Sequence, residues 1–318
     1  MLTFLLIFLI ALILTILLTP MVRSFAPEIG AMDKPSSRKV HNLNIPRIGG
    51  IAIYLSFLVA VLFGLLLLGG IRGSVINPRP ILGILLGGSI VMLTGFLDDI
   101  YRLKPQIKFA AQLLGAATAI YFGVEINFVT NPFNGLVPLG WIAVPLTLLW
   151  LVGMTNAINL IDGLDGLASG VTAISAGTLF FVALRTHQLG AALLMLALAG
   201  AALGFLRYNF FPASVFLGDS GSYFLGFILA AASIIGVFKT TLVVALIIPL
   251  LILGVPIFDT IFAIGRRLRE KKNPFAADNK HIHHLLLRAG LNQKEAVLAI
   301  YIVCVLLSAI ALMMALPK

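Results

Sequence analysis

The chain has 318 residues, of which 60% are hydrophobic and only 11% are charged, and its formal net charge at pH 7 is +10. Soluble globular domains carry roughly a quarter of their residues as charged side chains, so this composition excludes an ordinary soluble protein. The single cysteine, Cys304, excludes an internal disulfide framework.

Long apolar runs recur from one end of the chain to the other. A helix that crosses a bilayer needs about 20 mostly apolar residues, and short polar breaks separate the runs. Ten spans are predicted, at residues 2–20, 48–69, 81–97, 107–123, 141–158, 168–184, 190–206, 221–238, 241–264 and 296–316. The sequence therefore predicts an all-α polytopic membrane protein, with about ten transmembrane helices in a single integral membrane domain over residues 1–318.

The basic residues predict the orientation of these spans. Most of the 22 lysines and arginines fall in one set of loops, and cytoplasmic loops carry the excess of such residues. We therefore expect a multi-pass protein of the plasma (inner) membrane with both termini outside. Most of the aspartates gather on the same cytoplasmic face, which a bias of positive charge does not explain, so we expect the active site there.

The first polar segments surround the second and third spans. Arg47 belongs to the basic stretch "RKVHNLNIPRIGG", and Asp98 and Asp99 end the third span. A charged residue within a span costs roughly 2.5–3.5 kcal/mol by insertion scales, so each is a functional candidate. Adjacent carboxylates repel unless a cation lies near them, and Mg²⁺ binds through one or two carboxylates plus substrate phosphates. Lys108 begins the fourth span and is placed to reach a phosphate, although interhelical ion pairs would also account for these charges.

A second polar stretch, "NAINLIDGLDG", interrupts the apolar run that forms the fifth span. Its polar side chains recur at every third position: Asn156, Asn159, Asp162 and Asp165. On a helix the two asparagines share a face. Amides and carboxylates offer acceptors for a metal and for the edge of a nucleobase, and the glycines suit a turn that approaches a ligand. A polar helix end capped by Asn and Gly is the structural alternative.

The third segment, "FLGDSGSYFLGF", precedes the eighth span and contains Asp219. A helix that begins there would offer free backbone N–H groups and a positive dipole to an anion. Simple capping of the helix by a serine explains this stretch equally well. Phe216 is placed to stack on a base, although a single aromatic residue is more often packed.

The last segment is a long basic loop that contains "HIHH", with His281, His283 and His284. Two or three imidazoles could donate hydrogen bonds to a diphosphate. Zinc ligation is disfavoured because no cysteine lies nearby. Asn292 and Glu295 form a capping box, which predicts only the start of the tenth span.

Taken together, these five segments resemble the polyprenyl-phosphate N-acetylhexosamine-1-phosphate transferases, glycosyltransferase family four. The resemblance covers nearly the whole chain, with the motifs "RKVHNLNIPRIGG", "FLDDIYRLKPQIK", "NAINLIDGLDG", "FLGDSG" and "HIHH" in order. Because "HIHH" and "IPRIGG" stand in place of three consecutive histidines and a Thr-Pro-Thr-Met-Gly-Gly-like stretch, the chain is more similar to the undecaprenyl-phosphate N-acetylglucosamine branch than to the muramoyl-pentapeptide branch.

The resemblance implies that an undecaprenyl phosphate in the inner leaflet attacks the β-phosphorus of UDP-N-acetylglucosamine and releases UMP. Asp219 then looks like the principal Mg²⁺ ligand, with Mn²⁺ as a substitute, and Asn159 is similar to the family's asparagine at the metal–diphosphate site. Asp98 and Asp99 match an aspartate pair that handles the metal or the lipid phosphate, and Lys108 would hold phosphate. Asp99 is also the candidate base and a candidate metal ligand, although the lipid phosphate already carries a nucleophilic oxygen. A covalent route through an aspartate nucleophile is the alternative.

At the nucleotide end, the resemblance implies that Asp165 lies near the uracil, with Asp162 beside it and Phe216 stacked on the base. His283 and His284 would grip the diphosphate, with His281 assisting them. The remaining substrate-binding candidates are Asn156 and Arg47.

Other functions were weighed against this one. Within the family, the alternative is a phospho-N-acetylmuramoyl-pentapeptide transferase acting on UDP-MurNAc-pentapeptide. From another class, a transporter also has intramembrane carboxylates, but its site usually lies near the bilayer midplane between repeated halves. The expected partners are a UDP-sugar, a polyprenyl phosphate and the bilayer, with a homodimer as one possible assembly and no nucleic acid. The glycan that this step would begin could be teichoic acid, the O-antigen of lipopolysaccharide or capsule.

Overall fold

The structure, a computed structural model, describes residues 2–33, 44–69, 76–131, 135–238, 247–270 and 281–315. Most of these residues are helical. The α-helices are α1 (Leu2–Phe25), α2 (Gly50–Gly69), α3 (Pro78–Tyr101), α4 (Pro105–Tyr121), α5 (Ala143–Ile161), α6 (Leu167–Arg185), α7 (Leu189–Asn209), α8 (Gly218–Ser233), α9 (Ile247–Ile252), α10 (Gly254–Arg269), α11 (Ile282–Arg288) and α12 (Gln293–Ala315). A 3₁₀ turn (Gly140–Ile142) precedes α5, and a π-helical turn (Ile234–Phe238) follows α8.

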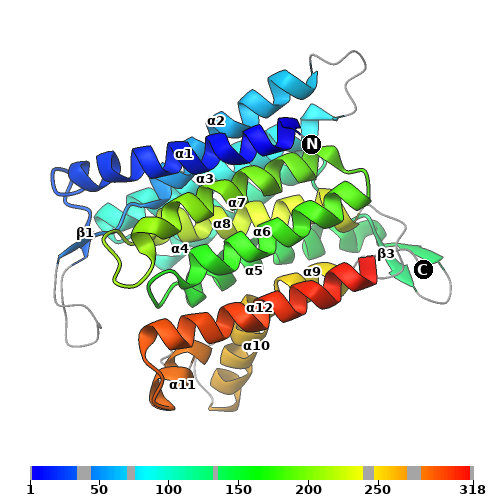
Figure 1. The fold of residues 1–318 in the computed structure, drawn as a ribbon. Helices are drawn as coiled ribbons and strands as arrows, with labels where there is room; N and C mark the ends of the chain where they lie inside the picture. Colours follow the sequence, from blue (N-terminus) through cyan, green and yellow to red (C-terminus); the bar gives the residue numbers. More distant parts are fainter. Residues whose placement is uncertain are drawn as a thin grey trace.

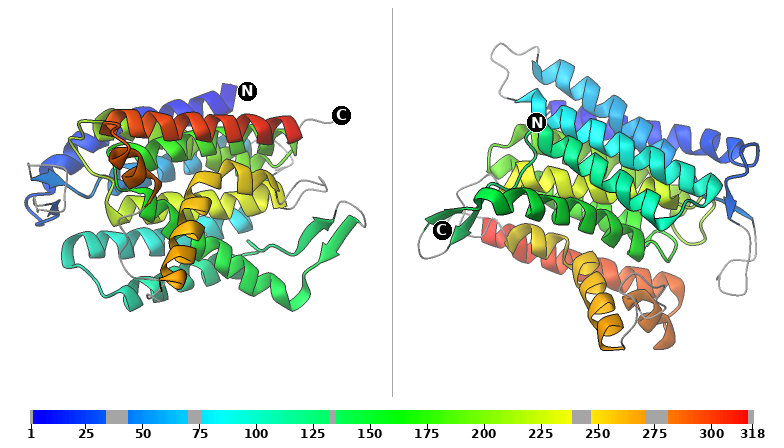
Figure 2. Two further views of the ribbon diagram at one scale, coloured as in Figure 1. Left: turned by 90° about the horizontal axis from the view of Figure 1, so that it is seen from below. Right: turned by 180° about the vertical axis from the view of Figure 1, so that it is seen from behind.

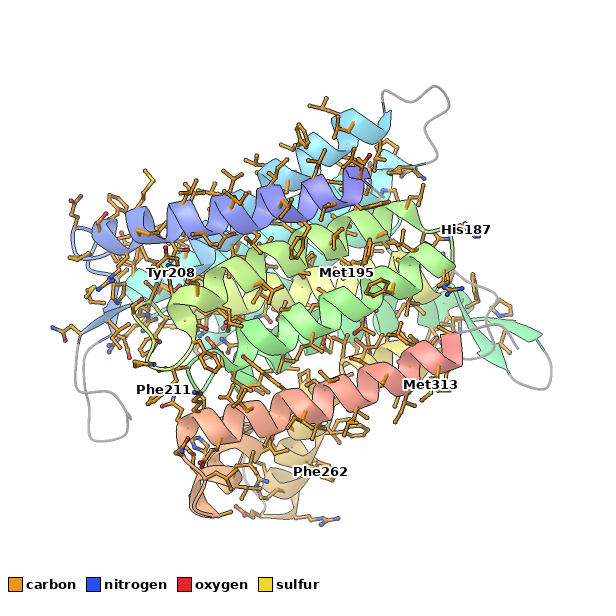
Figure 3. The ribbon with its side chains drawn as sticks, viewed as in Figure 1. His187, Met195, Tyr208, Phe211, Phe262 and Met313 are labelled. Carbon is orange, nitrogen blue, oxygen red and sulfur yellow. The ribbon has the colours of Figure 1, made fainter. Side chains whose placement is uncertain are left out.

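Within the described residues, eight helical stretches are long and apolar enough to cross a membrane: α1, α2, α3, α5, α6, α7, α8 continued into the π-helical turn (Gly218–Gly236), and α12. They lie side by side in one bundle, in which α1 begins and α12 ends at the same end (Figures 1 and 2). The opposite end carries Tyr208 and Phe211 (Figure 3). These helices confirm the prediction of an all-α polytopic membrane protein, while the count of ten spans and their orientation stay predictions.

The centre of the bundle is α8, in which every residue from Ser220 to Ser233 is buried. Helices α2, α3, α5, α6 and α7 pack around it. Small residues let membrane helices approach closely, and Gly95 on α3 shows how closely. A Cβ atom at Gly95 would overlap the backbone of Asp219 and Ser220. The absence of a side chain at this glycine therefore lets the third helix carry its carboxylates to the start of α8.

The predicted ninth span, residues 241–264, is wrong as one continuous helix. Within the described part, α9 ends at Ile252 and a separate α10 begins at Gly254. Pro256 has no N–H to donate to the carbonyl of Ile252, which breaks the helical hydrogen-bond pattern. The Oγ of Ser175 on α6 donates to that carbonyl at 3.1 Å instead. Helix α10 then leaves the bundle beside α11, with Phe262 on it (Figures 1 and 3).

Two smaller differences concern the loops and the fourth span. The predicted span at 107–123 is α4, which has only 17 residues and is not among the eight long helices. Two short antiparallel ladders, which the sequence analysis did not expect, join β1 (Met32–Asp33) to β2 (Ile45–Pro46) and β3 (Phe128–Asn131) to β4 (Gly135–Pro138). Residues 241–246 of the predicted ninth span and residues 38–43 of the motif before Arg47 lie outside the described residues.

The close packing of α3 on α8 at Gly95 can be tested with a pair of glycine-to-alanine variants. We expect Gly95→Ala to lower the free energy of unfolding by about 1–3 kcal/mol, because the added methyl forces α3 and α8 apart. Gly153→Ala on α5 is the control, since a Cβ there meets no described atom within 4 Å and alanine favours the helix by up to about 1 kcal/mol. Thermal unfolding of both variants in detergent measures the difference, and equal stability of the two would contradict the packing argument.

Candidate active site

A cavity of about 600 Å³ opens at the end of the bundle where α5 ends and α8 begins. Its walls come from the β1–β2 ladder, the α5–α6 turn, the segment before α8, and α11 with the start of α12. The predicted site residues that border this cavity are Arg47, Asp99, Asn159, Asp162, Asp165, Phe216, Asp219 and His284. Segments from the beginning, middle and end of the chain therefore meet around one space.

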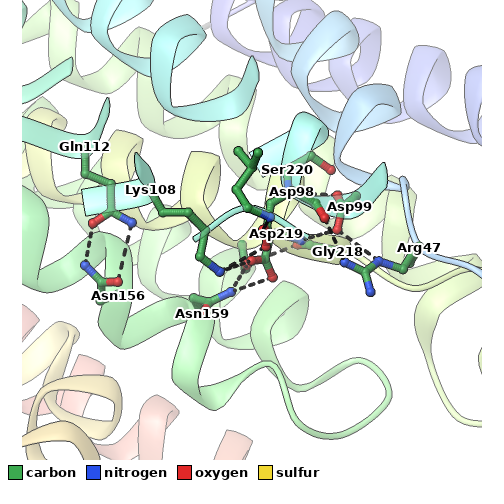
Figure 4. Close-up of polar contacts among 12 residues, drawn as sticks. Arg47, Asp98, Asp99, Lys108, Gln112, Asn156, Asn159, Gly218, Asp219 and Ser220 are labelled. Carbon is green, nitrogen blue, oxygen red and sulfur yellow. Dashed lines mark hydrogen bonds and ion pairs between the residues drawn. The ribbon is translucent and has the colours of Figure 1, made fainter. Parts of the chain in front are cut away.

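Asp219, in the first turn of α8, forms the charged centre of the cavity wall (Figure 4). Its Oδ1 accepts a hydrogen bond from Nδ2 of Asn159 at 3.1 Å, and its Oδ2 lies 3.3 Å from Nζ of Lys108. The same amide nitrogen of Asn159 donates to Oγ of Ser222 at 2.8 Å. The side chain of Asp219 is 24% exposed, so its carboxylate is accessible to a ligand in the cavity.

Lys108 lies between two carboxylates. Its Nζ is 3.0 Å from Oδ2 of Asp98 and 3.3 Å from Oδ2 of Asp219. The other oxygen of Asp98 accepts a hydrogen bond of 2.6 Å from the backbone N–H of Leu103, where the chain turns from α3 to α4. Neither Asp98 nor Lys108 is among the residues that line the cavity. Asp98 therefore orients Lys108, and Lys108 offsets the charge of Asp219 from the side that faces away from the cavity.

Asp99 borders the cavity, but its carboxylate holds the start of α8. Its two oxygens accept hydrogen bonds from the backbone N–H groups of Asp219 at 2.9 Å and Ser220 at 3.0 Å. Nε of Arg47 lies 3.3 Å from the same carboxylate, and no part of the Asp99 side chain is exposed. Gly218 makes this approach possible, since its φ of +74° is left-handed and a Cβ there would overlap the Asp99 oxygens. A negative charge at a helix N-terminus is stabilising.

The two asparagines of α5 have different hydrogen-bond partners. Asn159 reaches Asp219, whereas Asn156 exchanges amide hydrogen bonds of 2.7 and 3.4 Å with Gln112 on α4. Figure 4 shows this amide pair apart from the aspartate cluster, and Asn156 does not line the cavity. Gln112 was not among the predicted site residues, although a polar amide within a predicted span was a signal for it.

The α5–α6 turn carries the two remaining aspartates. Oδ2 of Asp165 accepts a hydrogen bond of 2.9 Å from the backbone N–H of Ala213, which ties the turn to the segment before α8. The hydroxyl of Tyr301 on α12 donates to the carbonyl of Gly166 at 2.6 Å. Burial, reinforced by the negative charge of Asp219, raises the pKa of Asp162 well above its usual range. The protonated form of Asp162 is therefore favoured more than that of an exposed aspartate.

The three histidines at the start of α11 differ in their access to the cavity. His284 lines the cavity, whereas His281 and His283 are buried and do not belong to its lining. His283 rests against Gly163, where a Cβ atom would overlap its Nε2. Nδ1 of His281 is 2.8 Å from Oδ2 of Asp259 on α10. The sequence analysis did not include Asp259 in the site, although an ionisable residue inside a predicted span was a signal for it.

The oxygen atoms at the cavity suit a hard cation such as Mg²⁺ only if a bound phosphate supplies further oxygen ligands. In the described residues, no three His, Cys, Asp or Glu side chains gather as a metal cage. Asp219 and the amide of Asn159 offer oxygens at the cavity, while the oxygens of Asp99 are engaged by backbone N–H groups. Mg²⁺ is typically held by one or two carboxylates plus substrate phosphates, so a site built on Asp219 fits that pattern.

Comparison with known proteins gives the family. Residues 81–237 match the family described as glycosyl transferase family 4. A relative from Bacillus subtilis, named probable undecaprenyl-phosphate N-acetylglucosaminyl 1-phosphate transferase, is 42% identical over 93% of this chain and 80% of its own length. The chain belongs to glycosyl transferase family 4. This confirms the resemblance on which the sequence analysis drew.

Other relatives of this family 4 transferase span comparable lengths. The decaprenyl-phosphate N-acetylglucosaminephosphotransferase of Mycobacterium tuberculosis is 36% identical over 92% of this chain and 78% of its own. The undecaprenyl-phosphate alpha-N-acetylglucosaminyl 1-phosphate transferase of Thermotoga maritima is 32% identical over 93% and 94%. The family match runs from α3 through the π-helical turn and so contains the Asp98–Asp219 cluster but not the histidines of α11.

His283 makes stability depend on pH. Burial, with a smaller contribution from His284, lowers the pKa of His283 to about 4, whereas an unfolded histidine takes up a proton near pH 6.5. As the pH falls from 7 to 5, the unfolded state binds the extra proton, so this residue should lower the free energy of unfolding by up to about 2 kcal/mol. Thermal unfolding at several pH values should show a shallower slope for His283→Gln, and an unchanged slope would contradict the buried neutral imidazole.

Proposed function

We propose that this family 4 chain transfers N-acetylglucosamine-1-phosphate from UDP-N-acetylglucosamine to undecaprenyl phosphate. An oxygen of the lipid phosphate attacks the β-phosphorus of the donor, the bond to the bridging oxygen breaks, and UMP leaves. The product is undecaprenyl-pyrophosphoryl-N-acetylglucosamine. The names of the relatives from three bacteria support this acceptor class and this sugar.

The observation that carries the proposal is the Lys108–Asp219–Asn159 cluster beside the cavity, with contacts of 3.3 and 3.1 Å. Phosphoryl transfer demands little covalent chemistry from the protein, so positioning and neutralisation of charge supply most of the rate. Two anions must meet here, and cationic groups have to offset their repulsion. Lys108 offsets the charge of Asp219 from outside the cavity. Asp219 with Asn159 would hold Mg²⁺ or Mn²⁺, which would supply positive charge at the phosphate oxygens.

The donor would lie in this cavity. Phe216 and the α5–α6 turn belong to its lining, and the uracil would lie against them. Burial raises the pKa of Asp162, and in its protonated form this carboxyl would donate a hydrogen bond to the nucleotide. His284 would donate to the diphosphate from α11. Arg47, which lines the cavity and contacts Asp99, would hold the phosphate of the lipid.

The membrane context supports a lipid acceptor. The cavity opens at one end of a bundle whose outer helices expose large apolar side chains, such as Leu93 and Leu97 on α3. A polyprenyl chain can lie against such a surface while its phosphate reaches the bundle end. We infer that this end faces the cytoplasm at the plasma membrane, and that the reaction is the first membrane step of a cell-envelope glycan pathway.

Replacing Asp219 tests the charged centre. Asp219→Asn keeps the shape of the side chain but removes the charge that faces Lys108 and the metal. We expect transfer to fall by at least about 100-fold, as for removal of other transition-state electrostatic groups, while expression and the melting temperature stay close to those of the wild type. Near-wild-type turnover at saturating Mg²⁺ would show that Asp219 does not hold the metal.

The donor is tested directly with purified protein, undecaprenyl phosphate and Mg²⁺. UDP-N-acetylglucosamine and UDP-MurNAc-pentapeptide are supplied in separate reactions, and release of UMP is followed. We expect turnover with the first donor and only when the lipid is present. Turnover with the muramoyl donor alone would assign the other branch of the family, and UMP release without lipid would indicate a covalent route.

A further inference from the structure

Helix α10 carries a buried carboxylate that the proposed transfer reaction does not use. Asp259 is only 8% exposed. One oxygen accepts a hydrogen bond from the backbone N–H of Ile282 at 2.8 Å, and the other lies 2.8 Å from Nδ1 of His281. Both oxygens thus hold the segment where α11 begins, from a different helix.

This contact points to one position for the proton of His281. A carboxylate accepts hydrogen bonds, so the geometry assigns the proton to Nδ1. The second nitrogen of a neutral His281 ring, Nε2, is then an acceptor. A carboxylate that fixes the tautomer and the ring plane of a histidine is a recurrent way of preparing an imidazole for its task.

His281 is linked to the cavity through ring contacts with His283 and His284. The rings of His281 and His283 are parallel, with an interplanar angle of 3° and centroids 5.9 Å apart, and the rings of His283 and His284 are 4.2 Å apart. His283 is seated against Gly163 in the α5–α6 turn, and His284 lines the cavity. A change in the plane of His281 would therefore alter how its ring packs on His283, which in turn contacts His284.

We propose that Asp259 is a positioning residue for the histidine motif. It holds His281 in one tautomer and one plane, and so seats His283 under the α5–α6 turn and His284 at the cavity, where the diphosphate of the donor would lie. This inference rests on the proposed function, because the histidines need this precision only if they bind a phosphate group. A purely structural role, in which Asp259 only joins α10 to α11, predicts different results.

Asp259→Asn separates these roles, because the side chain keeps its shape while the amide nitrogen becomes a donor. The amide would donate to Nδ1 of His281 and so favour the reversed tautomer, while its oxygen still accepts from Ile282. We expect kcat/KM for the UDP-sugar to fall at least about tenfold, as for loss of other groups that orient histidines. The KM for the lipid phosphate and the melting temperature should stay close to wild type, whereas a structural role would lower the melting temperature and raise both KM values.

A double-mutant cycle tests whether Asp259 acts through His281. If it does, the Asp259→Asn/His281→Ala protein should be no slower than His281→Ala alone, because coupled residues are not additive. Glu295→Gln is the control, since it makes the same carboxylate-to-amide change in a capping box on α12, within the same C-terminal segment. It should leave turnover unchanged. The proposal would be overturned if the fold-losses in turnover of the two single variants multiplied in the double variant. Wild-type kinetics for Asp259→Asn would also overturn it.

A measurement on the unmodified protein keeps the proposal testable should the variant not fold. In ¹⁵N-histidine spectra, His281 should show a proton on Nδ1, and a proton on Nε2 alone would overturn the assignment. This result does not depend on the donor. Failure of the wild type to use UDP-N-acetylglucosamine would instead refute the proposed function and leave the tautomer of His281 as measured.

Discussion

The ion pair between Lys108 and Asp219 is the interaction on which the site depends. Burying like charges in a helical bundle is costly unless they are paired, and α3 and α8 bring Asp98 and Asp219 to the same lysine. The lysine therefore offsets the repulsion between these two carboxylates at the end of an apolar bundle. It also leaves the outer face of Asp219 available to the cavity.

The position of Asp219 in turn depends on the packing of α8. Gly95 lets α3 touch the first turn of α8, and the carboxylate of Asp99 holds the backbone N–H groups of Asp219 and Ser220. The adjacent residues Asp98 and Asp99 therefore have different roles. Asp98 orients the lysine and Asp99 fastens the helix that carries the acidic centre, so both act on the cavity largely through other groups.

The C-terminal helices complete a site that the family-matched segment alone does not enclose. Tyr301 binds the α5–α6 turn at Gly166, and His283 rests on Gly163 in the same turn. Because α10 leaves the bundle after the break at Leu253, Asp259 reaches the start of α11. The break that makes the ninth span discontinuous is therefore also what places the histidines.

The sequence by itself determined the class of fold, the family and most of the polar residues that meet at the cavity, because apolar run length and the cost of burying charge are local properties. It did not determine which polar group each one contacts. Asn156 and Asn159 share a helix face, yet one pairs with Gln112 and the other with Asp219. Asp259 likewise acquired its role only from its partners at the start of α11. Those choices depend on how helices distant in the sequence pack, and the tertiary structure alone decides that.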